Sequence, residues 1–286
     1  MTGSTYNVTS SATLGSALVF ASPHSGRDYT PEFLRQSVLD ERTIRSSEDA
    51  YVDHLFDAAP QFGAPFITAS APRAFLDLNR SPDELDPALI SGIRSSGHNP
   101  RIASGLGVIP RVVAGGRAIY RGKLSRQEAD QRIESHWHPY HRALQGLLDQ
   151  AHARFGQAIL IDCHSMPHEA MDGIARGSVR RPDVVLGDRF GAAASEEIVD
   201  QVEEAFVRAG FTVTRNAPFA GAYITQSYGR PSRRQHAIQV EIDRSLYMNE
   251  RRVEPNANFQ SVRSSLRRVT SEISQIGQSR IPLAAE

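Results

Sequence analysis

The chain of 286 residues is poor in cysteine and tryptophan, with one of each. Its single cysteine, Cys163, excludes an internal disulfide framework and a zinc-finger cluster. Neither sign of charge is in excess, because 32 Lys and Arg residues balance 32 Asp and Glu residues. The sequence therefore lacks the electrostatic footprint of a protein that binds nucleic acid or an anionic membrane.

Long apolar runs are also missing. No stretch of the sequence approaches the length needed to cross a bilayer. Residues 1–7 lack the basic segment and apolar core that begin a secretory signal. We therefore expect a soluble, cytoplasmic protein, a location that also suits a lone cysteine. No membrane or nucleic-acid partner is expected, and no feature of the sequence specifies an oligomeric state.

Apolar, partly β-branched runs alternate with amphipathic helical patterns along most of the chain. This alternation predicts one α/β domain over residues 1–286, with a core from about 14 to 276 and a mixed, largely parallel sheet flanked by helices. Strands are expected at 14–22, 64–69, 74–79, 158–166, 183–187, 211–214 and 237–243. Helices are expected at 31–39, 46–59, 125–156, 195–209 and 258–276, an inserted β-hairpin at 108–120, and loops at 81–101 and 216–229.

Two of the predicted strands end in a His-Ser pair. The strand at 158–166 contains His164-Ser165, and the first strand is followed directly by His24-Ser25. In open α/β sheets, ligands bind at the carboxyl ends of the strands. A catalytic zinc commonly uses two histidines and a carboxylate, and it keeps one position open for water. His24 and His164 are therefore candidate zinc ligands.

The carboxylate of such a site can be chosen in several ways. Asp28 follows His24 by four residues, whereas Glu48 and Asp49 lie at the start of the helix predicted from residue 46. The residues alone leave all three open.

The helix predicted at 125–156 carries further histidines, but none of them forms a ligand motif. We expect them to be solvated or packed at the edge of the core: His136, His138, His141 and His152.

Glu241 interrupts an apolar strand. An isolated buried carboxylate is unfavourable, so this side chain is a candidate for a site, where it could act as a general base. Asp243 shares its face of the strand and suits either a site or a salt bridge with Arg244 or another arginine.

An amide and a guanidinium end the strand predicted at 74–79. Arg80 offers a planar fork that can grip a carboxylate through two hydrogen bonds, and Asn79 lies beside it. Arg73, nearby in sequence, could polarise a carbonyl oxygen.

Several short motifs, in this order, resemble the N-formylglutamate amidohydrolase (deformylase) family over about Leu18 to Asn249. They are Pro23-His24-Ser25-Gly26, Asp49 with Leu55-Phe56-Asp57, Asp77-Leu78-Asn79-Arg80, Asp162-Cys163-His164-Ser165 and Glu241-Ile242-Asp243-Arg244-Ser245-Leu246-Tyr247-Met248. The resemblance implies a phosphorylase/hydrolase-like α/β fold, related to zinc carboxypeptidases and aspartoacylase. It also implies a mononuclear zinc enzyme that cleaves the amide of an N-acyl amino acid.

The resemblance assigns a role to each candidate residue. His24, Asp49 and His164 would hold one zinc ion per chain, and Glu241 would be the general acid/base. The pair Asn79-Arg80 would hold the substrate carboxylate, and Arg73 would polarise the carbonyl. Carboxypeptidase-type enzymes carry their ligand glutamate three residues after the first histidine, where this chain has Arg27. The ligand aspartate of the family corresponds to Asp49 here, so the resemblance favours Asp49 over Glu48 and Asp28.

The expected reaction is hydrolysis of N-formyl-L-glutamate to formate and glutamate, a step that the family name links to histidine breakdown. The alternatives are another N-acyl amino acid, a peptide C-terminus, or a non-catalytic module that binds a carboxylate or a metal. Glu241 argues against the last, because binding alone needs no base. A glutamate substrate needs a second cationic contact, for which Arg121, Arg189 and Arg230 are unranked candidates.

Overall fold

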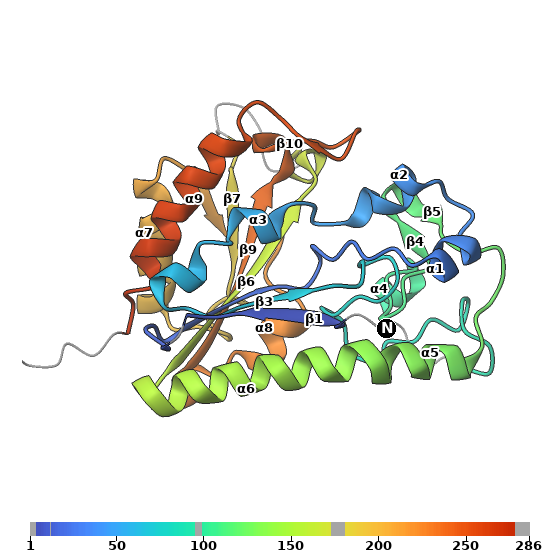
Figure 1. Ribbon diagram of the computed structural model, residues 1–286, viewed down its shortest axis with the longest axis horizontal. Helices are drawn as coiled ribbons and strands as arrows, with labels where there is room; N and C mark the ends of the chain where they lie inside the picture. Colours follow the sequence, from blue (N-terminus) through green and yellow to red (C-terminus); the bar gives the residue numbers. More distant parts are fainter. Residues whose placement is uncertain (1–3, 12, 95–98, 173–180, 278–286) are drawn as a thin grey trace, which may run out of the picture.

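A seven-stranded mixed sheet forms the centre of the computed structural model, which describes residues 4–11, 13–94, 99–172 and 181–277 (Figure 1). The strand order is β1-β3-β2-β6-β9-β7-β8, and only the β1–β3 and β7–β9 pairs are antiparallel. The predicted α/β class with a largely parallel mixed sheet is confirmed. The strands of this sheet are β1 (Tyr6–Thr9), β2 (Leu18–Ser22), β3 (Phe66–Ala69), β6 (Ala158–Met166), β7 (Val184–Gly187), β8 (Val213–Arg215) and β9 (Gln235–Asp243).

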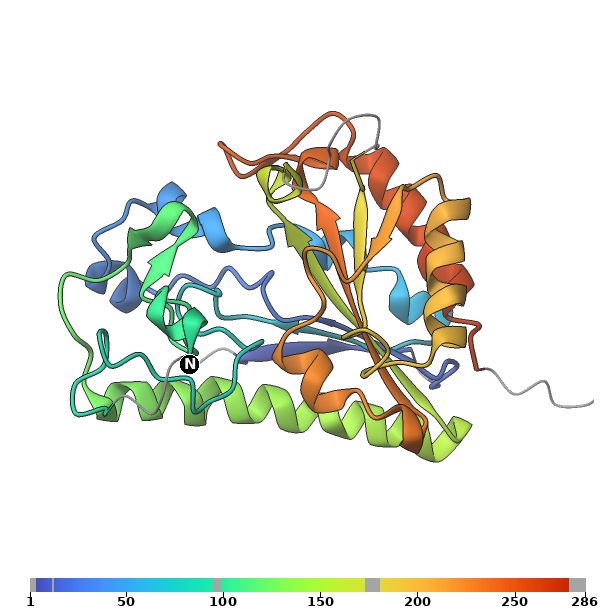
Figure 2. The ribbon, with the colours of Figure 1, turned by 180° about the vertical axis from the view of Figure 1, so that it is seen from behind.

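Helices cover both faces of the sheet. Figures 1 and 2 show α6 along one face, with α8 beside it, and α3, α7 and α9 on the other. Residues of β6 alternate between the two cores, because Leu160 packs on the α6 side and Ile159 and Ile161 pack on the α9 side. These helices are α3 (Val52–Leu55), α6 (His138–Phe155), α7 (Glu196–Arg208), α8 (Tyr223–Tyr228) and α9 (Phe259–Ile273).

A group of short elements lies beside the sheet and above the start of the long helix (Figure 1). It consists of α1 (Pro31–Gln36), α2 (Glu41–Ile44), α4 (Pro100–Ala103) and the hairpin of β4 (Val112–Val113) and β5 (Arg117–Ala118). The predicted hairpin is therefore present but shorter than 108–120. Residue 108 has other partners: its N–H bonds Glu84 O at 2.9 Å and its carbonyl accepts from Asp77 N at 2.8 Å. A second small hairpin, β10 (Met248–Asn249) and β11 (Glu254–Pro255), follows β9.

The long helix predicted at 125–156 is confirmed. The Ser125 hydroxyl caps it by accepting a hydrogen bond from Glu128 N at 3.1 Å, and Gly156 ends it with a φ of 69°. It consists of α5 (Arg126–Arg132), a π-helical turn (Ile133–Trp137) and α6. Within the π-helical turn, the Trp137 indole donates to the Arg80 carbonyl at 2.9 Å and so ties the helix to a candidate site residue.

The strand predicted at 74–79 is wrong. The chain turns there instead, with Phe75 N donating to Pro72 O at 2.9 Å and Asn79 N donating to the Asp77 carboxylate at 2.8 Å. These local bonds replace the ladder bonds that a strand would need.

The helix predicted at 46–59 is also wrong, because Tyr51 has a φ of 66° and interrupts it. The short helix α3 and a 3-10 turn, Ala59–Phe62, follow, and Asp49 lies in the loop before α3 rather than in a first helical turn. The loop predicted at 216–229 contains α8, and the helices predicted at 31–39 and 258–276 end early, at Gln36 and Ile273. Residues 95–98 of the predicted loop at 81–101 lie outside the described residues.

Among the residues that the structure describes, no helix has the length and apolar character required to cross a membrane.

Truncation of Leu148 should show how far the α6 face stabilises the fold. Leu148 is fully buried under the sheet, so Leu148→Ala should lower the free energy of unfolding by about 2–5 kcal/mol. Gln150→Ala, at an exposed position of the same helix, should change it by less than about 0.5 kcal/mol. Urea unfolding followed by circular dichroism measures both, and equal effects would contradict the packing described here.

Candidate metal centre and active site

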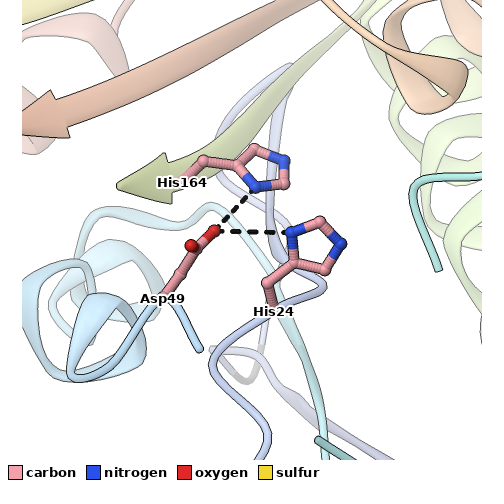
Figure 3. A group of neighbouring side chains, drawn as sticks. All are labelled: His24, Asp49 and His164. Atoms are coloured by element: carbon pink, nitrogen blue, oxygen red, sulfur yellow. Dashed lines mark hydrogen bonds and ion pairs between the residues drawn. The ribbon is translucent and has the colours of Figure 1, made fainter. Parts of the chain in front are cut away.

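His24, Asp49 and His164 meet in a buried cluster, drawn in Figure 3. His164 comes from the last part of β6, and His24 from the loop after β2. Asp49 Oδ2 lies 2.9 Å from Nδ1 of His164 and 3.4 Å from Nδ1 of His24. The loop that carries His24 requires Gly26, because a Cβ at that position would lie 2.1 Å from the Ala71 carbonyl oxygen. All three predicted ligands are thus in one place.

The donor atoms of this cluster fit a metal ion. Nδ1 of His24 is buried and makes no hydrogen bond. The opposite ring nitrogens face acids: Nε2 of His24 lies 2.7 Å from Asp77 Oδ1, and Nε2 of His164 lies 3.0 Å from Asp162 Oδ2. The Asp77 carboxylate behind His24 keeps the proton on Nε2 of that ring and aims its Nδ1 lone pair at the centre, as is usual for histidine ligands of metals.

The structure selects Asp49 among the candidate carboxylates. Asp49 N donates to the His24 carbonyl at 3.0 Å, which brings the two residues together. Arg244 holds the other carboxylate oxygen, Oδ1, at 2.8 Å, so Oδ2 alone faces the histidines. Glu48 instead forms an ion pair with Arg45 at 2.9 Å, and Asp28 is exposed.

Arg27 occupies the place where carboxypeptidase-type enzymes carry a glutamate. Its side chain pairs with Asp53 at 2.7 Å, on the surface, and so takes no part in the cluster.

Acids in and beside the cluster favour a positive charge at its centre. Burial opposes ionisation of Asp49, but the hydrogen bond to His164 and the nearby charges of His24 and His164 outweigh burial and hold its pKa well below the usual range. Burial likewise opposes protonation of His164, yet Asp162 and Asp49 raise its pKa well above that of a free imidazole. A site that draws a proton onto a buried imidazole in this way also favours a metal cation.

Glu241 lies beside His164, because the two residues are register partners in the parallel β6–β9 pair and share one face of the sheet. Burial is the main cause that raises the pKa of Glu241 to about 7, and the charge of Asp49 adds to it. Its carboxylate accepts a hydrogen bond from Gln239 at 2.9 Å. A carboxyl with this pKa can both take and give a proton near neutral pH.

Asp77 links the cluster to Arg73. One carboxylate oxygen faces His24, and the other accepts from Arg73 Nε at 3.1 Å. Burial opposes ionisation of Asp77, but His24 and Arg73 hold its pKa well below normal. Burial also opposes the charge of Arg73, yet Asp77 and Asp49 outweigh it and raise the Arg73 pKa.

Asn79 contacts His164, and Arg80 follows Asn79 in the chain. The Asn79 amide nitrogen is 3.2 Å from Nε2 of His164, and its oxygen accepts from Ile224 N at 2.7 Å. Arg80 is buried, and its Nε makes no hydrogen bond. Burial lowers the Arg80 pKa, and the charges of Arg101 and Arg73 lower it further. A buried guanidinium with a free donor is suited to an anionic ligand.

Two clefts border this region. The first, of about 460 Å³, is lined by Arg80, Arg101, Arg189 and Tyr223 among others. The second, of about 640 Å³, lies between α2, the β4–β5 turn and the loops after β6 and β9, and Arg244 is part of its wall. Of the three arginines considered for a second carboxylate, Arg189 lines the first cleft, whereas Arg121 and Arg230 are exposed and line neither.

The sequence did not predict the contacts that several residues make in the site. Asp243 pairs with His168 at 2.6 Å rather than with an arginine, and Arg244 pairs with Asp49 instead. Asp162 and Gln239 support His164 and Glu241 from behind. The only sequence signal for these supports is alternation, because each lies two residues before the side chain that it contacts.

The long-helix histidines stand apart from the cluster, as expected. His141 is buried and lies 2.8 Å from the Tyr228 hydroxyl and 2.9 Å from the Leu78 carbonyl oxygen. Its pKa is lowered to about 4, mainly by burial.

The family model described as N-formylglutamate amidohydrolase matches residues 16–248. The chain belongs to this family. The resemblance drawn from the short motifs is thereby confirmed, and so is the enzyme class, a hydrolase of linear amides.

Relatives of the N-formylglutamate amidohydrolase family cover most of the chain. Proteins named N-formylglutamate deformylase from Pseudomonas aeruginosa and Pseudomonas putida are 31% and 30% identical over 240 residues, which is 82% of this chain and 82% of each relative. The crystal structure of N-formylglutamate amidohydrolase from Ralstonia eutropha JMP134 is 34% identical, with a TM-score of 0.88 over 95% of this chain and 98% of that one. A gene product of Agrobacterium tumefaciens, 15% identical with a TM-score of 0.65 over 95% of each chain, shares the fold.

Metal binding should depend on the acid behind each histidine. Asp77→Asn removes the charge that fixes His24 and should weaken zinc affinity by about 10–100-fold. His24→Ala, which removes a donor atom, should weaken it more. Competition with a chromophoric chelator gives both affinities. His138→Ala, on α6 outside the cluster, is the matched control, and a similar loss in this control would contradict the assignment.

The buried charge of Glu241 should be visible in the stability of the metal-free protein. The folded-state pKa, about 7, lies above that of an unfolded glutamate, so the folded state binds this proton more tightly. The stability contributed by the proton is present at low pH and is lost as pH rises from about 4.5 through 7. Glu241→Gln cannot lose a proton, so its stability relative to wild type should increase from pH 5 to pH 8.

Urea unfolding of chelator-treated wild type and Glu241→Gln at both pH values measures this difference, in which the titration of distant groups cancels. A pH-independent difference would show that Glu241 is ordinarily solvated.

Proposed function

We propose that this protein hydrolyses N-formyl-L-glutamate to formate and glutamate with the help of a zinc ion. The observation that carries the proposal is the placement of Glu241 next to His164 in the His24, Asp49 and His164 cluster. The names of the Pseudomonas relatives, N-formylglutamate deformylase, support the choice of substrate.

His24, Asp49 and His164 would hold the ion. Two imidazoles and one carboxylate are a donor set typical of catalytic zinc. When bound there, the ion would polarise a carbonyl group and lower the pKa of water.

Glu241 is the proton carrier in this proposal. It accepts a proton from the attacking water and passes it to the amide nitrogen that leaves as the free amine. Because its pKa is close to neutrality, neither transfer is strongly uphill at physiological pH.

Arg73 and the pair Asn79-Arg80 position the substrate. Arg73 is held by Asp77, and its charge stabilises the oxygen that becomes negative during attack on the formyl carbon. Arg80 binds the α-carboxylate, with Asn79 beside it. This contact explains why a free N-acyl amino acid would be preferred over an internal peptide bond.

The zinc-loaded protein should release glutamate from N-formyl-L-glutamate, and a chelator should stop the release. Glu241→Gln should lower kcat by at least about 10²-fold while zinc stays bound, because the proton carrier is lost and the three ligands remain. Coupled detection of glutamate and a metal assay on the same sample measure both effects.

Two other substrates serve as comparisons. N-acetyl-L-aspartate and a dipeptide test the alternative acyl group and the alternative peptidase activity. Full turnover by Glu241→Gln would overturn its role. A zinc-loaded wild type that leaves N-formyl-L-glutamate intact would overturn the substrate.

A further inference from the structure

We propose that Arg101 and Arg189 form a second carboxylate subsite, which binds the side-chain carboxylate of the amino acid while Arg80 binds its α-carboxylate. The inference deepens the proposed function and rests on it for the reaction.

The cleft that contains Arg80 has an excess of positive charge. Three arginines line it, and the one acid of its lining is Glu84. Glu84 does not neutralise Arg80 well, because its carboxylate lies 3.9 Å from Arg80 Nε and neither atom has a hydrogen-bond partner. Buried donors that the protein leaves unpaired favour an anionic ligand that pairs with them.

The second cleft, beside Arg244, differs in this respect. Four arginines line it, but so do Glu169, Asp172 and Glu250, and Arg244 is already paired with Asp49. Its charge is therefore close to balanced, which makes it the weaker candidate for a second carboxylate.

Hydrogen bonds connect the wall of the cleft that contains Arg80 to Glu241 and His164. Ala222, in that wall, donates its N–H to Gln239 at 3.1 Å, and Gln239 donates to Glu241 at 2.9 Å. Asn79, next to Arg80, contacts His164. The cleft is therefore linked to Glu241 through Gln239 and to His164 through Asn79, with one side chain intervening in each case.

The backbone around Arg189 is held in an unfavourable conformation. Arg189 and Phe190 both have a φ of 56°, in the left-handed region that non-glycine residues rarely occupy. Asn216 stabilises the turn, donating to Asp188 Oδ1 at 2.6 Å and accepting from Phe190 N at 3.3 Å. Backbone strain of this kind clusters at ligand sites, where surrounding bonds keep one side chain in place.

Close packing around the same turn fixes its position against the wall of the cleft. Arg189 N donates to Ala220 O at 2.7 Å. A Cβ at Gly187 would lie 2.7 Å from Gly221 N, so only glycine allows the two loops to approach this closely. On the opposite side, Asn99 caps α4 by accepting from Arg101 N at 3.0 Å, which places Arg101 at the rim of the cleft.

The test compares two substrates that differ only in the second charge, N-formyl-L-glutamate and the neutral N-formyl-L-glutamine. Wild type should prefer the glutamate derivative in kcat/KM. Arg189→Gln should lower kcat/KM for it by about 10–100-fold, since one charge-assisted contact is lost, and leave the glutamine derivative within about threefold. Arg101→Gln should act in the same direction, and Arg189→Lys should restore part of the preference.

Arg121→Gln is the matched control, because it removes the same charge from an exposed position outside both clefts. An unchanged preference in both Arg101→Gln and Arg189→Gln, or an equal fall for both substrates, would overturn the inference and leave the proposed function intact.

A binding measurement separates failure of the inference from failure of the proposed function. If wild type hydrolyses neither derivative, calorimetric titration with L-glutamate and L-glutamine still tests the subsite. Binding of L-glutamate that Arg189→Gln weakens and Arg121→Gln does not would support it. Absence of L-glutamate binding to zinc-loaded wild type would overturn it.

Discussion

Negative charge buried at one edge of the sheet is the constraint on which the site depends. Asp49, Asp77, Asp162 and Glu241 are all shielded from water, and an unpaired buried carboxylate is strongly unfavourable. Two of these carboxylates form ion pairs with arginines: Asp77 with Arg73, and Asp49 with Arg244. The imidazole of His24 lies between Asp49 and Asp77, and that of His164 lies between Asp49 and Asp162. A divalent cation bound by Nδ1 of His24, Nδ1 of His164 and Oδ2 of Asp49 would add a positive charge among these acids. The electrostatic interactions that organise this edge of the sheet therefore also favour metal binding there.

Local sequence patterns located the parts of this site that depend on local structure. His24 and His164 follow or end apolar strands, and Glu241 interrupts one, so the apolar runs and their ends were sufficient to single them out. Asp49 could not be chosen in this way, because its position depends on the His24 carbonyl and on Arg244, which is 195 residues away. The resemblance to the family supplied what local patterns could not. Asp162 and Gln239 lie two residues before His164 and Glu241 on the same strands, and this spacing was their only signal in the sequence.

The failed element predictions have a common physical cause. The segment 74–79 has the composition of a strand, but the Asp77 side chain bonds the backbone of Asn79, and the Asp77 backbone bonds Val108. Near residue 49, the left-handed Tyr51 interrupts a helical pattern of apolar residues. In both places the chain departs from its local preference beside residues to which we assign a role in the proposed reaction, and such conflicts are expected at functional sites. Elsewhere, as in the capped helix from Ser125 to Gly156, local and long-range preferences agree and the prediction holds.

The parallel pairing of β6 with β9 has a consequence for how such a protein can diverge. His164 and Glu241 face each other across one rung of this ladder, so their separation follows from the spacing between adjacent strands, about 4.8 Å, and not from side-chain packing. Main-chain hydrogen bonds do not depend on which apolar residues fill the layers above and below. The separation of the proposed metal ligand and the proposed proton carrier is thus little affected by substitutions in the core. Arg80 and Arg189 of the first cleft lie on loops, so they can change more freely and alter which acid the site acts upon.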